Sequence, residues 1–109
     1  MKTADRLIAE RRAAVERELV AAAGDDSLCA VSKSGGEVDA VKYLEGRMAV
    51  LMQLGGVLRR HGDVATAIAE MLSDWSAQLT SVQERDAGRG WIAYRAGGVD
   101  ELSGLTDLR

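Results

Sequence analysis

The stretch VKYLEGRMAVLMQLGGVLRR, at positions 41–60, carries the densest apolar sequence in the chain. On a helical wheel, at roughly 100° per residue, its apolar side chains fall on two faces. The first face holds Val41, Leu44, Met48, Leu51 and Met52, and the second holds Tyr43, Val50, Leu54 and Val57. A surface helix normally shows one apolar stripe of about 100°. The pattern therefore predicts a central helix that is buried on two sides.

The second apolar face has two possible covers. In one interpretation it packs inside a monomeric bundle, and in the other it meets a second subunit or another protein. The argument for a partner is that few other segments of this short chain remain to cover the second face. The second interpretation makes Tyr43, Val50, Leu54 and Val57 candidate partner-binding residues.

Arg47 and three glycines interrupt this apolar stretch. A buried guanidinium cannot be left unpaired, so we expect Arg47 to meet a carboxylate of the first helix, of the third helix or of a partner chain. The alternative is that its stem lies along apolar surface while its head reaches water. Gly55 lies on the first face and is expected to permit close helix approach, although Gly55 and Gly56 together are also candidates for a bend or break.

Two further helices are predicted on either side of the central one. Thr3 is a suitable N-cap for a helix that runs to about Ala23. His61, Gly62 and Asp63 mark a short turn, with Asp63 as the N-cap of a third helix. That helix is expected to run from Val64 to about Asp86. Its apolar residues recur at heptad-like spacing, at Ala65, Ile68, Leu72, Trp75, Leu79 and Val82.

The short turn at Gly62 predicts that the second and third helices form a long antiparallel hairpin. The fold expected from the sequence is therefore all-α: an elongated helical hairpin plus an N-terminal helix, which together make a three-helix bundle over residues 1–87. The lack of proline and phenylalanine, and an apolar set rich in Ala, Leu and Val, favour helices over strands.

Residues 88–109 are expected to form an extended or short-strand C-terminal arm. Glycines flank the run Trp91-Ile92-Ala93-Tyr94-Arg95-Ala96, which ends at Gly97 and Gly98, and its aromatic and β-branched residues suggest a short strand. It would pair with the apolar run at 28–31, with another copy, or lie across the bundle, because an isolated strand is unstable. Trp91 and Tyr94 are candidate docking residues, the alternative being that they cap the hydrophobic core.

Composition excludes several kinds of site. The formal net charge of −3 gives no reason to expect non-specific nucleic-acid binding. One cysteine, Cys29, cannot form a disulfide within the chain, and one Cys with one His does not supply an ordinary zinc site. We therefore expect no metal and no cofactor. The first residues lack the apolar core of a secretory signal, and no long apolar run suggests a membrane span. A cytoplasmic protein, or one packaged in a larger particle, is the expectation.

Residues 58–72, LRRHGDVATAIAEML, resemble the opening of a Fis-type helix-turn-helix, in which a glycine and a capping residue lead into an Ala-rich helix. The resemblance implies a DNA-binding regulator. The match stops there, because residues 71–75 continue the heptad seam instead of making the usual glycine turn, and no basic recognition helix follows.

Catalysis has little support in the sequence. His61 is the only histidine, it lies at a predicted helix end, and no nucleophile is matched to a base. The prediction is therefore a non-enzymatic structural or interaction protein, either a homo-oligomer or a small subunit of an assembly such as a viral particle or an adaptor complex. Its predicted contacts are the second face of the central helix, Arg47 and the arm.

Overall fold

The computed structural model describes residues 4–23, 36–61 and 63–106. They form helices α1 (Ala4–Ala23), α3 (Gly36–His61), α4 (Val64–Glu84) and α5 (Arg89–Gly104). The all-α prediction is confirmed, and no strand occurs in these ranges. The expected N-cap at Thr3, Cys29 and the run at 28–31 lie outside the described residues.

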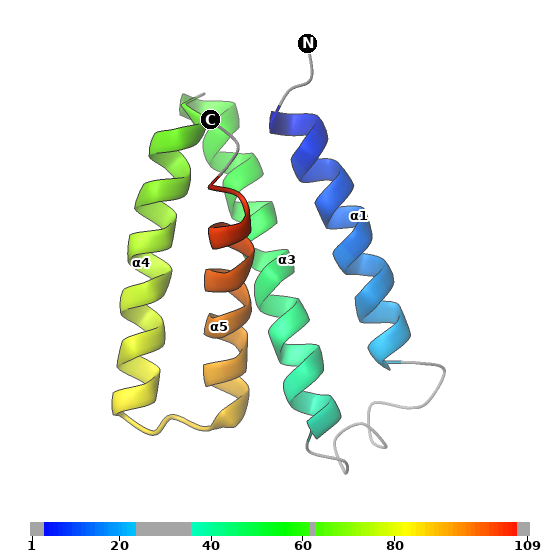
Figure 1. Ribbon diagram of the computed structural model, residues 1–109, viewed down its shortest axis with the longest axis vertical. Coiled ribbons are helices and arrows are strands. Elements are labelled where there is room, and N and C mark those ends of the chain that lie inside the picture. Colours follow the sequence, from blue (N-terminus) through cyan, green and yellow to red (C-terminus); the bar gives the residue numbers. More distant parts are fainter. Residues whose placement is uncertain (1–3, 24–35, 62, 107–109) are drawn as a thin grey trace.

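The helices form an up-and-down bundle (Figure 1). α1 runs antiparallel to α3, α4 runs antiparallel to α3, and α5 returns parallel to α3 after a short connection. The molecule is flattened, with extents of 45 × 34 × 20 Å. α3 is the central element because it packs extensively on both α1 and α5.

The predicted C-terminal arm is wrong. Most of the segment expected to be extended, including 91–96, forms α5, which packs against α3 and α4. Leu102 of α5 and Leu105, the residue that follows it, are enclosed in the core. α5 packs on the second apolar face of α3, the face for which the sequence suggested a partner.

The predicted hairpin is confirmed in direction but not in packing. Asp63 caps α4 as expected, because its side chain accepts a hydrogen bond from the backbone N–H of Thr66. However, α3 and α4 make few direct contacts, and α5 packs more extensively on each of them. One direct link is the Trp75 indole N–H, which donates to Oε1 of Gln53 at 3.2 Å.

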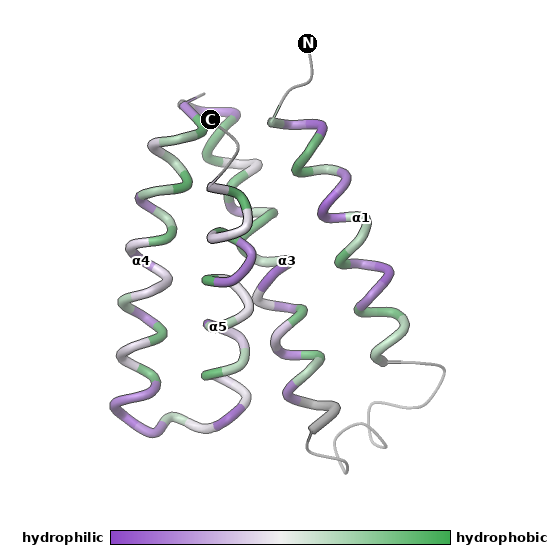
Figure 2. Tube along the Cα trace, viewed as in Figure 1, coloured by the Kyte–Doolittle hydropathy of each residue, from purple (hydrophilic) through white to green (hydrophobic). Residues whose placement is uncertain are grey.

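The core draws apolar side chains from all four helices. Along α1, polar and apolar residues alternate in short groups (Figure 2), and Ile8 and Val15 are buried. In α4 the buried residues are Ala67, Ile68, Met71, Trp75 and Val82. Three of these belong to the predicted seam, but Ala65 is exposed. Among the described residues, none of the helices combines the length and hydropathy that crossing a membrane requires.

Glycines set the close approach of α3 and α5. A Cβ atom at Gly46 would collide with the backbone carbonyl of Tyr94, and one at Gly97 would collide with the carbonyl of Tyr43. A Cβ at Gly98 would strike the Trp75 ring and Val50. Glycine is therefore required where the two backbones meet.

Gly55 does not have the role expected for it. The nearest atom to a Cβ there is Nη1 of Arg59, at 3.9 Å, so no neighbouring helix approaches closely. α3 also continues without a break through Gly46, Gly55 and Gly56.

Candidate functional site

The second face of the central helix is covered by the chain itself. Val50 and Leu54 are each 0% exposed, and Val57 is partly buried against the core. α5 lies on this face, since Gly97 meets the backbone of Tyr43 and Gly98 meets Val50. The expectation that Val50 and Leu54 face a partner is therefore wrong.

Tyr43 is partly buried and fixes α5 to α3. Its hydroxyl donates a hydrogen bond to Oδ2 of Asp100 at 2.5 Å. This bond, together with desolvation and the negative charge of Asp100, raises the pKa of the Tyr43 hydroxyl above its ordinary value. The phenol therefore stays neutral and acts as a donor within the chain.

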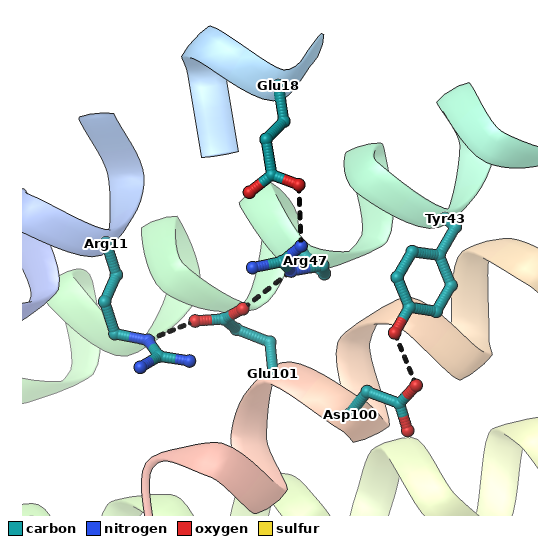
Figure 3. Close-up of polar contacts among 6 residues, drawn as sticks. All are labelled: Arg11, Glu18, Tyr43, Arg47, Asp100 and Glu101. Carbon is teal, nitrogen blue, oxygen red and sulfur yellow. Dashed lines mark hydrogen bonds and ion pairs between the residues drawn. The ribbon is translucent and has the colours of Figure 1, made fainter. Parts of the chain in front are cut away.

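Arg47 joins three helices through carboxylates (Figure 3). Its Nε donates to Oε1 of Glu101 at 2.8 Å, and its Nη1 lies 3.4 Å from Oε1 of Glu18 in α1. Arg11 of α1 also donates to Glu101, which is only 2% exposed. Burial alone would lower the pKa of Arg47, but the hydrogen bond and attraction to Glu101, with Glu18, raise it.

The expected carboxylate partner of Arg47 is thus present within the chain. Glu18 lies in the first helix, which was one of the predicted sources of the carboxylate. Glu101 lies in the segment that was predicted to be an extended arm. Since the guanidinium groups of Arg11 and Arg47 meet the carboxylates of Glu18 and Glu101 here, the cluster is a structural tie between α1, α3 and α5.

Trp91 and Tyr94 separate into two roles. Tyr94 is partly buried and packs on the core, with its ring centroid 5.5 Å from that of Trp75. Trp91 is 59% exposed and meets Tyr94 edge to face, with 6.1 Å between ring centroids. A large exposed indole next to a fixed aromatic ring is the feature of this surface that packing does not explain.

Two hollows border the Trp91 side chain. The first has a volume of about 390 Å³ and is lined by Lys42, Gly90, Trp91 and Tyr94. We call these four residues the Trp91 surface. The second has a volume of about 530 Å³ and is lined by Gln78, Val82, Arg85, Ala87, Trp91 and Arg95. We call it the cationic hollow.

The charges around the two hollows differ. Beside the Trp91 surface, Lys42 pairs with Glu45 at 3.2 Å and Arg89 pairs with Asp39 at 2.6 Å. This rim therefore carries both signs of charge. In the cationic hollow, neither the Arg85 nor the Arg95 guanidinium pairs with a carboxylate of the described residues.

Several residues of the site were not found from the sequence. Glu101 and Arg95 gave no signal, because a carboxylate and a guanidinium in a supposed arm look like ordinary surface charges. Gly97 and Gly98 were interpreted as the end of a strand. Two adjacent glycines within an apolar segment could have indicated a close approach between two helices instead.

Other predicted features give no site. α4 continues unbroken from Val64 to Glu84, without the turn that the helix-turn-helix resemblance requires. Within the described ranges, no group of three or more Asp, Glu, His or Cys residues is placed to hold a metal ion.

The chain was compared with protein-family models, with curated proteins and with solved structures, and none of the three comparisons found a match.

Proposed function

We propose that this chain is a non-enzymatic interaction protein that associates with a second copy of itself, and that the Trp91 surface is the contact. The observation that carries the proposal is the 59% exposure of Trp91 directly beside a hollow. Tyr43, Arg47, Val50 and Leu54 are not part of it, since their contacts lie within the chain.

The residue types support a protein contact. Tryptophan is enriched among the residues that dominate binding energy at interfaces, where it fills a pocket and is shielded from water. An indole ring buries a large apolar area and keeps one polar N–H. Tyr94, held against Trp75, gives the adjacent hollow a fixed wall.

The shape and charge of this surface favour a second copy as the partner. A projecting side chain beside a hollow is complementary to itself, because a two-fold axis would place each Trp91 in the hollow of the other copy. The pairs Lys42–Glu45 and Arg89–Asp39 give the rim both signs of charge. Opposite charges can therefore face each other across the axis.

The test is sedimentation equilibrium of the full chain from about 1 to 200 µM, the range that reveals micromolar association. We expect a reversible dimer, weakened at least about tenfold by Trp91→Ala, as for an interface hot spot. Met52→Ala is the matched control, because Met52 is 54% exposed and lies outside both hollows. A monomer throughout this range, or an equal effect of both variants, would reject the proposal.

A further inference from the structure

The cationic hollow is a second feature beside Trp91, and self-association through the Trp91 surface does not use its arginines. Its volume of about 530 Å³ lies in the range of small-molecule sites, about 300 to 1,000 Å³. Val82 and Ala87 line it with apolar surface, the Trp91 indole forms a wall, and Gln78 adds an amide.

The two guanidinium groups are held in place without using all their donors. Arg95 stacks 4.6 Å from the ring centroid of Trp75 and 5.5 Å from that of Tyr94. Arg85 donates from Nε to the Ser81 hydroxyl at 3.2 Å. Stacking and this bond restrict both side chains, while their remaining N–H groups make no ion pair with the part of the chain that the structure describes.

Charge complementarity indicates which ligand fits. A guanidinium presents a planar set of N–H donors that matches the two oxygens of a carboxylate. Two such groups beside an apolar floor suit an anion that carries an apolar body. A neutral apolar molecule would leave the cations without a partner, and a second copy would bring the same two cations to them.

We propose that the cationic hollow binds a small organic carboxylate. Arg85 and Arg95 receive the carboxylate, and the apolar body lies against the Trp91 indole, Val82 and Ala87. No covalent step is involved. The hollow is thus a ligand site that is separate from the proposed dimer contact, although the two share Trp91.

The probe is 2-naphthoate, titrated into the full chain at a concentration where the protein is monomeric and followed by NMR of the arginine and indole N–H signals. The matched neutral probe is 2-naphthamide, which has the same rings without the charge. We expect saturable binding of 2-naphthoate that is at least about tenfold tighter than that of the amide. Added salt should weaken it.

Variants locate the site. Arg85→Gln and Arg95→Gln should each weaken 2-naphthoate binding about tenfold, whereas Arg59→Gln, an exposed arginine of α3 outside the hollow, should leave it unchanged. Arg85→Gln changes an exposed side chain, so it keeps the test decisive if Arg95→Gln disturbs the packing of Trp75.

Any one of four results would overturn the proposal. Three of them are no saturation by 2-naphthoate below about 10 mM, equal affinity for the amide, and a loss of binding in Arg59→Gln equal to that in Arg85→Gln. The last measurement is a titration with inorganic phosphate. If it binds as tightly as 2-naphthoate, the hollow is a bare anion site, and the assignment to an organic carboxylate is wrong. Because the protein is monomeric in this experiment, the outcome does not depend on self-association.

Discussion

Glu101 is the one buried charged residue in the part of the chain that the structure describes. Its carboxylate is buried and accepts from both Arg11 and Arg47. Removing one partner of a buried ion pair leaves the other charge uncompensated, at a cost of about 3 to 5 kcal/mol. We expect Glu101→Gln to lower the free energy of unfolding by about 3 kcal/mol, measured by urea denaturation at neutral pH.

The control for this prediction is Glu10→Gln, which removes one carboxylate from the exposed Arg6–Glu10 pair on α1. Exposed pairs contribute about 0 to 1 kcal/mol, so this variant should unfold close to the wild type. If the two variants lose similar amounts of stability, the cluster around Glu101 is not the tie that its burial indicates.

The substitutions Gly46→Ala and Gly55→Ala test how closely α3 is packed at each position. An alanine at either position improves helix propensity by about 1 kcal/mol. At Gly55 the new methyl group meets only Nη1 of Arg59 at 3.9 Å, an ordinary contact with a flexible side chain, so we expect a stability gain of up to about 1 kcal/mol. At Gly46 it collides with the Tyr94 carbonyl, so Gly46→Ala should destabilise the fold by several kcal/mol.

Thermal and urea unfolding of both glycine variants provide the measurement. Opposite signs for the two substitutions are the expected result. Equal gains would mean that α5 does not lie against α3 at Gly46.

At the scale of the helix, α4 begins with a cap that is sensitive to pH. The Thr66 hydroxyl donates to Asp63 at 2.5 Å, and this bond, with the backbone N–H of Thr66, lowers the pKa of the Asp63 carboxyl. The unfolded chain then binds the proton more readily than the folded one. The stabilisation is present above the ordinary pKa of aspartate and is lost as the pH falls through the lowered folded value.

Asp63→Asn isolates this effect, because asparagine is also a good N-cap but does not titrate. We expect the wild type to lose more stability than Asp63→Asn between about pH 5 and 2. Thermal melts of both proteins across this range provide the measurement. Parallel curves would show that the cap does not couple to protonation.

The helices differ in how well the sequence predicts them. For α3 and α4 the periodicity, the predicted Asp63 cap and the predicted short turn before it all favour two helices. The predicted ends of the third helix, Val64 and about Asp86, lie close to those of α4. For α5 the local sequence signals conflict with the observed helix. Gly90, Gly97 and Gly98 disfavour a helix by about 1 kcal/mol each, and aromatic residues between glycines favour a strand.

Tertiary packing overrides that local preference in α5. Gly97 and Gly98 allow its backbone to reach α3, and Leu102 and Leu105 then become fully buried. Such a contact joins residues far apart in the sequence, so periodicity within one segment could not reveal it. The same limit applies to the site, because the two hollows exist only where α5 meets α3 and α4.

At the scale of the whole molecule, α1 is the least integrated helix. It packs mainly on α3, whereas α5 contacts both α3 and α4. Among its described side chains, the buried apolar ones are Ile8 and Val15, and it is tied to α5 by the ion pair between Arg11 and Glu101. Elements with few buried contacts open locally at a lower free energy than the rest of a protein.

We therefore predict that α1 opens before the other three helices. Native-state hydrogen exchange should give the backbone amides of α1 a lower opening free energy than those of α3 and α5. Glu101→Gln should lower the value for α1 beyond its effect on global unfolding, because it removes the tie through Arg11. Exchange of α1 amides only through global unfolding would contradict this, since α1 would then be as firmly held as the core formed by α3, α4 and α5.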